Sequence, residues 1–233
     1  MTHSDVSLQQ HYDEMYANAL KHFQGQGVQT DPLIDDPSDR RTGLTLLIRP
    51  PEAVCHKISG IIEDFRALLP DQYFYPESDM HITIMSIISC YPEFNTQDFQ
   101  ADPYIELTKE CLEGIPPIKI NLKGITASPA GLVIQGFPMD RHLNKLRDVL
   151  RQRFRASELE ESIDRRYTIR TAHLTFMRFR KPLRETDTFI QLLNNHRNTS
   201  IGEFTVDNMQ LTINDWYQKE AKTTLIHRFK QGR

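Results

Sequence analysis

The chain has 233 residues, 39% hydrophobic and 25% charged, with a formal net charge of −3 at pH 7. This length and apolar content exclude a disordered chain, and the acidic balance argues against a protein that binds long nucleic acids through their phosphates. The three cysteines, Cys55, Cys90 and Cys111, have the spacing of neither a metal site nor a disulfide framework, which predicts reduced thiols. Because we find neither a signal peptide nor a membrane-spanning apolar stretch, we expect a cytoplasmic protein.

Residues 1 to 40 are predicted to form an N-terminal helix and an acidic arm that pack on the rest of the chain. Apolar side chains recur at helical spacing from His11 to Phe23, and the Gly25-Gln26-Gly27 sequence ends this pattern. Aspartates and prolines between residues 31 and 39 predict an irregular arm after the helix. We expect the aromatic residues of the helix to serve packing, not ligand binding.

Residues 41 to 233 are predicted to form one domain with two lobes, at about 41–138 and 139–233. The elements expected in the first lobe are a strand at 43–49, a helix at 52–68, strands at 73–75 and 80–88, a helix at 104–112, and a hairpin of strands at 118–125 and 131–136. Those expected in the second are a helix at 140–154, a strand at 167–180, a helix at 186–194, and strands at 204–214 and 223–228. On the helix at 140–154 the arginines, Arg147 among them, are expected to be exposed.

The order strand, helix, strand, strand occurs in both lobes and predicts an α+β fold. We expect two antiparallel sheets backed by helices, arranged about an approximate twofold axis with a cleft between them. The short linker requires the lobes to pack together, and the sequence leaves open whether they interleave.

One five-residue pattern occurs twice, as His81-Ile82-Thr83-Ile84-Met85 and His173-Leu174-Thr175-Phe176-Met177. In a regular strand alternate side chains share a face, so histidine, threonine and methionine are expected on one face and the other two residues in the core. The imidazole and the hydroxyl would lie roughly 7 Å apart along each strand. A single His-x-Thr strand is more often structural than catalytic, but its repetition with the same fifth residue favours a duplicated functional unit.

These paired His-x-Thr-x motifs resemble those of the two-histidine (2H) phosphoesterase superfamily, which includes RNA 2′-5′ ligase-like proteins and cyclic nucleotide phosphodiesterases. The resemblance extends over about residues 42–230. It implies a bilobal fold, acid/base roles for His81 and His173, and contacts to the substrate phosphate from Thr83 and Thr175.

Two histidines and two hydroxyls suit the cleavage of a phosphodiester. A neutral imidazole can take a proton from the attacking oxygen, while a protonated one gives a proton to the leaving oxygen. Hydroxyl donors can stabilise charge on the non-bridging oxygens. This chemistry requires no metal or cofactor. The equivalence of the motifs leaves open which histidine is the base.

Positive charge gathers beside the second motif. Residues 141–184 hold thirteen Lys and Arg against five Asp and Glu, whereas residues 1–40 hold two against seven. Arg170 and Arg178 lie three and five positions from His173, so in a regular strand they face away from it, and a phosphate contact would require a bulge or a strand end. Arg170 is retained as a candidate substrate contact.

Aromatic residues near the motif strands or in strand turns are candidates for stacking a nucleobase, with core packing as the alternative for each. The aromatic residues so placed are Tyr75, Tyr91, Tyr167, Trp216 and Tyr217, and all of them except Tyr91 are taken as candidate substrate contacts.

The sequence thus predicts a metal-independent phosphodiesterase that hydrolyses a cyclic phosphate, either a 2′,3′-cyclic nucleotide or an RNA end. One alternative is an enzyme that cleaves or joins 2′-5′ linkages, and another is a nucleotide- or RNA-binding module without turnover. A non-nucleotide phosphodiester is also compatible with the motifs. We expect a small substrate, no membrane partner and no extended nucleic-acid binding, and hypothesise that residues 1 to 40 restrict the cleft to small substrates. The oligomeric state is left open.

Overall fold

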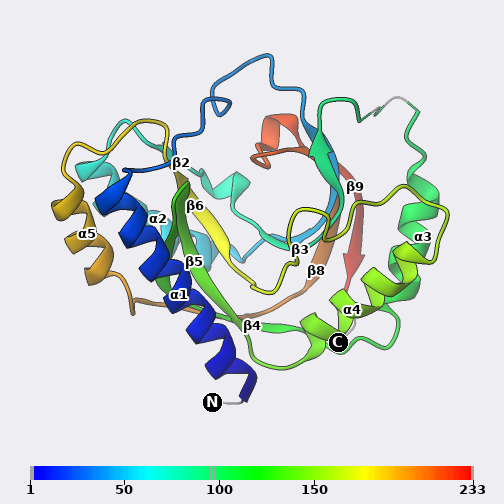
Figure 1. The fold of residues 1–233 in the computed structure, drawn as a ribbon. Helices are drawn as coiled ribbons and strands as arrows, with labels where there is room; N and C mark the ends of the chain where they lie inside the picture. Colours follow the sequence, from blue (N-terminus) through cyan, green and yellow to red (C-terminus); the bar gives the residue numbers. More distant parts are fainter. Residues whose placement is uncertain (1–2, 95, 97, 232–233) are drawn as a thin grey trace.

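The computed structural model describes residues 3–94, 96 and 98–231 and is drawn in Figure 1. Its elements are, in chain order, α1 (His3–Gly25), β1 (Thr42–Ile48), α2 (Glu52–Leu68), β2 (Tyr73–Phe74), the 3-10 turn η1 (Glu77–Asp79), β3 (Ile82–Tyr91), α3 (Ala101–Leu112), β4 (Lys119–Ser128), β5 (Gly131–Pro138), α4 (His142–Arg155), β6 (Leu174–Arg178), α5 (Thr186–Asn195), β7 (Ser200–Thr205), β8 (Asn208–Asp215), the 3-10 turn η2 (Glu220–Lys222) and β9 (Thr224–Lys230). All five predicted helices are present. Four lie close to their expected bounds, whereas α1 begins at His3, eight residues before the predicted start at His11.

Two antiparallel sheets form the framework, which confirms the predicted α+β class. The four-stranded sheet has the order β3-β1-β8-β9 and the five-stranded sheet the order β2-β6-β5-β4-β7. Each sheet therefore combines strands from early and late parts of the sequence. The first motif strand, β3, lies at an edge of one sheet, and the second, β6, pairs with β2 and β5 in the other.

Two predicted strands differ from the structure. The stretch expected as one strand at 204–214 is two strands, because the chain leaves β7 in one sheet and enters β8 in the other across Val206 and Asp207. The strand expected at 167–180 is only the five residues of β6, since the backbone pairs with neighbouring strands over that length alone. His173 thus precedes its strand directly, as His81 precedes β3.

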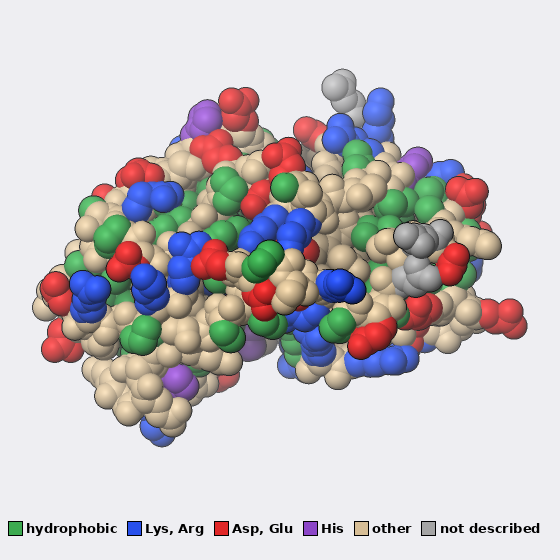
Figure 2. Space-filling view, turned by 90° about the horizontal axis from the view of Figure 1, so that it is seen from above, with side chains coloured by type: hydrophobic (Ala, Val, Ile, Leu, Met, Phe, Trp, Pro, Cys, Tyr) green, Lys and Arg blue, Asp and Glu red, His purple; other side chains and the backbone are tan. Residues whose placement is uncertain are grey.

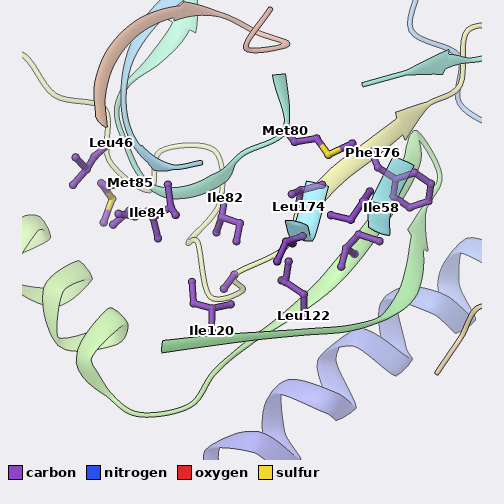
Figure 3. Close-up of a cluster of buried hydrophobic side chains, with 14 of the residues drawn as sticks. Leu46, Ile58, Met80, Ile82, Ile84, Met85, Ile120, Leu122, Leu174 and Phe176 are labelled. Atoms are coloured by element: carbon purple, nitrogen blue, oxygen red, sulfur yellow. The ribbon is translucent and has the colours of Figure 1, made fainter. Parts of the chain in front are cut away.

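The core fills the space between the sheets. The second residue of each motif, Ile82 and Leu174, is fully buried as the alternation predicts. Figure 3 draws both in one cluster with Ile120 and Leu122 of β4. The second residue of each motif therefore anchors its strand in the hydrophobic core.

The N-terminal helix α1 packs on β4 and β5, as Figure 1 shows. Its Tyr12 hydroxyl donates a hydrogen bond to the Gly136 carbonyl oxygen (3.0 Å), and the Thr126 hydroxyl donates to the Tyr12 carbonyl oxygen (3.0 Å). After α1, residues 26–41 contain no helix or strand, as predicted, and run across the top of the molecule to β1. We call residues 26–41 the acidic arm.

The three cysteines are unpaired and buried, in agreement with the expected reduced thiols. Burial raises the pKa of the Cys90 thiol to about 12 and those of Cys55 and Cys111 to about 11, so none of them is a reactive thiolate at neutral pH. No helix within the described residues is long and apolar enough to cross a membrane.

Candidate active site

Each motif strand has a bulge immediately after its threonine. On β3, Thr83 and Met85 pair with the consecutive residues Leu47 and Leu46, so that Ile84 is passed over. On β6, Thr175 and Met177 likewise pair with consecutive residues of β5, and Phe176 is passed over. The two halves of the site thus share an irregularity that a residue pattern does not reveal.

The bulges change which side chains share a face with the motif threonines. An extra residue reverses the alternation beyond it, so both methionines turn into the core, where Met85 and Met177 are fully buried. The expectation that they share a face with the histidines is therefore wrong. Ser86 and Arg178 occupy the half-buried positions instead. A contact between Arg178 and phosphate requires a bulge in its strand, and β6 has such a bulge.

Each motif histidine is held through Nδ1 by the residue two positions before it. Nδ1 of His81 lies 2.8 Å from the Asp79 carbonyl oxygen, and Nδ1 of His173 lies 2.5 Å from the Thr171 hydroxyl oxygen. A carbonyl oxygen only accepts, so Nδ1 of His81 carries a proton and Nε2 of the neutral ring is left as a proton acceptor.

Burial lowers the pKa of both histidines, to about 3 for His81 and about 4 for His173. Nearby positive charges contribute to both values: Arg49 and Arg178 lower the pKa of His81, and Arg147 and Arg178 lower that of His173. The two imidazoles therefore share one electrostatic environment. Both are neutral in the empty cleft at neutral pH.

Arg178 is fixed by two of the predicted aromatic residues. Its Nε donates to the Tyr75 hydroxyl (2.8 Å), and its guanidinium carbon lies 5.6 Å from the centre of the Tyr217 ring. Both rings are buried, so they position the arginine and offer no open face to a nucleobase. The Tyr75 ring also lies 6.4 Å from that of His81, which brings this group next to the first motif.

The other three predicted contacts lie farther out. Trp216 is half-buried between the guanidinium groups of Arg166 (4.5 Å) and Arg41 (5.0 Å), and the ring of Tyr167 is 64% exposed. Trp216 and Tyr167 line a small cavity of about 60 Å³ together with Ser86, which places them beside the first motif.

Arg170 is not part of this group. It is exposed and lines a different pocket, between α1 and α4, with His11 and Asp148 among its neighbours. The structure therefore gives Arg170 no place beside Arg178.

Arg147 of α4 connects the backbone of the first motif to the backbone just before the second motif. The motif pattern does not predict this role. Arg147 is 1% exposed, and it donates hydrogen bonds to the carbonyl oxygens of Thr83 (3.0 Å), Ile84 (3.0 Å) and Thr171 (2.8 Å). The expectation that this arginine is exposed is therefore wrong. Its position four residues after the buried Leu143 places it on the apolar stripe of the helix, a signal that the sequence does contain.

Tyr12 connects the N-terminal helix to the second histidine. The Thr171 side chain lies close enough to the buried Tyr12 hydroxyl to lower its pKa, and it contacts Nδ1 of His173. A helix expected to serve packing alone thus also supports the residue that orients His173.

The face of the molecule that carries the acidic arm is rich in charge. Figure 2 shows Lys and Arg side chains gathered near its middle, with Asp and Glu side chains beside them. Within the described residues, no group of three or more His, Cys, Asp or Glu is arranged to hold a metal ion. The site therefore offers two neutral imidazoles, two hydroxyls and a guanidinium.

Comparisons with known proteins identify the fold. No family model and no curated protein matches the chain. Among solved structures, TT0787 of Thermus thermophilus is 16% identical, with a TM-score of 0.58 over 81% of this chain and 97% of that chain. ATU0111 from Agrobacterium tumefaciens str. C58, a conserved protein of unknown function, is 14% identical, with a TM-score of 0.55 over 91% and 97% of the two chains. E. coli LigT complexed with 3′-AMP is 13% identical, with a TM-score of 0.51 over 83% and 99%. The chain has a 2H phosphoesterase-like fold, as the paired motifs imply.

Proposed function

We propose that this chain is a metal-independent phosphodiesterase that hydrolyses a cyclic phosphate, either a 2′,3′-cyclic nucleotide or an RNA end. His81 and His173 act as the acid/base pair, and Thr83 and Thr175 bind the phosphate. Arg178 is added as a third phosphate contact, because the bulge in β6 turns it to the side of these groups.

The observation that supports this proposal best is that both imidazoles are held through Nδ1 in the same way. In each motif Nδ1 is engaged by the residue two positions earlier, which leaves Nε2 for proton transfer. An imidazole held in this way has a defined orientation at little entropic cost in the transition state.

In the proposed reaction a water molecule attacks phosphorus, and one histidine takes a proton from that water. The bond from phosphorus to one ribose oxygen breaks, and the other histidine gives its proton to that oxygen. The product is a nucleoside phosphate monoester. The hydroxyls of Thr83 and Thr175 and the guanidinium of Arg178 bind the non-bridging oxygens, where charge accumulates.

The lowered pKa values of the histidines fit this scheme once substrate is bound. A phosphodiester carries a negative charge, and an adjacent negative charge raises the pKa of an imidazole. Substrate binding therefore favours protonation of one ring, while the empty cleft keeps both neutral.

A nucleotide is the preferred substrate class. E. coli LigT, whose fold this chain shares, has been crystallised with 3′-AMP and with NADP+. In this chain Trp216 and Tyr167 beside the first motif are the residues proposed to contact the base. The first alternative is cleavage or joining of a 2′-5′ linkage by the same groups, and the second is nucleotide or RNA binding without turnover.

The decisive experiment measures turnover of 2′,3′-cyclic mononucleotides, 3′,5′-cyclic nucleotides and 2′-5′ dinucleotides in EDTA. We expect His81→Ala and His173→Ala each to lower kcat by about 10² to 10⁴. His56→Ala, which removes an exposed histidine of α2, is the matched control and should retain activity. Turnover of none of these compounds by the wild type, with measurable binding, would favour the module without turnover.

A further inference from the structure

We propose that the acidic arm sets the upper size of the substrate, by neutralising the positive charges along which the phosphates of a longer nucleic acid would continue. This inference rests on the proposed function, since it concerns which phosphodiesters enter the same cleft. It identifies the substrate class as one with a single phosphodiester at the site and no further phosphate beyond Arg178.

The arm is fixed to the second motif strand. The Asp31 amide donates to the carbonyl oxygen of Phe179 (2.9 Å), and the Gln29 amide donates to that of Pro129 in the β4–β5 turn (2.8 Å). Ile34 is fully buried, and its carbonyl oxygen accepts a hydrogen bond from Lys219 Nζ (2.6 Å). These contacts hold the arm beside the end of β6 and the turn between β4 and β5.

The arm compensates Arg180 but leaves Arg178 available. Asp35 forms an ion pair with Arg180, with 2.7 Å between the carboxylate and Nε. Within the described residues Arg178 forms no salt bridge, and its Nε donates to the uncharged hydroxyl of Tyr75. The Asp31 carboxylate of the arm contributes to the raised pKa of Arg178 without forming an ion pair with it. The segment after His173 thus presents one arginine without an ion pair at the end of β6, followed two residues later by one that is paired.

The arm also neutralises charge at its other end. Arg41 forms a two-pronged pair with Asp39 (2.8 and 2.9 Å), and its guanidinium faces the Trp216 ring. A chain of phosphates that left the site over either arginine would have to break an ion pair and approach a carboxylate. Like charges at short range repel, whereas a cyclic mononucleotide would bind at Arg178, which has no salt bridge within the described residues.

The test compares a 2′,3′-cyclic mononucleotide with an oligonucleotide that ends in a 2′,3′-cyclic phosphate. In Asp35→Asn the ion pair with Arg180 is lost, so we expect affinity for the oligonucleotide to rise about fivefold at low salt. Affinity for the mononucleotide should stay within about twofold of wild type. Fluorescence anisotropy and competition measure both, so the result does not depend on turnover and separates this inference from the proposed activity.

Two further variants show whether the charge itself is responsible. Asp36→Asn changes a neighbouring carboxylate that bonds to Ser38 and should leave both affinities unchanged. Adding Arg180→Gln to Asp35→Asn should abolish the gain, because the freed guanidinium is the new phosphate contact. An unchanged oligonucleotide affinity in Asp35→Asn, or an equal rise for both ligands, would overturn the inference.

Discussion

The hydroxyl of Thr171 lies 2.5 Å from Nδ1 of His173, two residues along the chain. At the corresponding place in the first motif, the carbonyl oxygen of Asp79 lies 2.8 Å from Nδ1 of His81. One histidine is therefore oriented by a side chain and the other by the backbone. Only the first of these contacts can be removed by a simple substitution.

Thr171→Val keeps the shape of the side chain and deletes its hydroxyl. We expect kcat to fall about tenfold with little change in KM, because the ring of His173 loses the partner that orients it while the phosphate contacts remain. Thr171→Ser should restore most of kcat. Steady-state kinetics on the preferred substrate measures both, and equal losses in the two variants would point to a packing role alone.

Arg178→Gln removes the cation that faces the proposed phosphate position. We expect kcat/KM to fall about 100-fold, because the charge on the non-bridging oxygens increases in the transition state. Arg178→Lys should recover only part of this loss, since lysine lacks the planar fork by which the guanidinium bonds to Tyr75 through Nε and presents its other N–H groups to the phosphate. A kcat/KM within about threefold of wild type would contradict the assignment.

Arg147→Met replaces a buried guanidinium with an apolar side chain. Three carbonyl oxygens lose their donor, so we expect the free energy of unfolding to fall by about 3 kcal/mol. Urea titration followed by circular dichroism measures the change. Arg141→Met at the exposed start of the same helix is the control and should alter the stability by less than about 0.5 kcal/mol. An unchanged stability in Arg147→Met would show that water replaces the lost donor.

The histidine pKa values predict how stability depends on pH. In the unfolded chain a histidine titrates near 6.5, whereas in the folded protein burial lowers the pKa of His81 to about 3 and that of His173 to about 4. Below pH 6.5 the unfolded chain therefore binds protons that the folded chain does not, and the free energy of unfolding falls as the pH falls toward 4.

Urea unfolding at several pH values between 7 and 4.5 tests this dependence. We expect wild type to lose about 3 kcal/mol between pH 6.5 and 5, and the double variant His81→Asn/His173→Gln to lose clearly less. Parallel pH profiles for the two proteins would show that neither imidazole is buried in its neutral form.

The sequence predicts the elements of this fold better than the details of its site. Helices such as α2 and strands such as β1 follow from local apolar spacing, which a single segment contains in full. The bulges after Thr83 and Thr175 do not, because they arise from the register with neighbouring strands. A prediction that assumes strict alternation therefore places Arg178 on the face opposite His173, which is wrong.

The residues that support the motif histidines are also difficult to predict from the sequence. Tyr12 lies more than 150 positions before Thr171, and only the folded chain brings the two together. The usual exposure of arginine assigns Arg147 to solvent, although its helical position is apolar. Histidine and threonine can be recognised because their motif repeats, whereas their partners occur once.

The chain passes between the two sheets repeatedly, from β1 to β2, back to β3, on to β4, and again from β7 to β8. Because the chain crosses between the sheets several times, the two strands that follow the histidines cannot move apart about a single hinge. We therefore expect the separation of the two histidines to be a fixed property of the native state. A cut within the chain should likewise release no half that retains one motif in folded form, and limited proteolysis should yield either a nicked, still associated molecule or complete degradation.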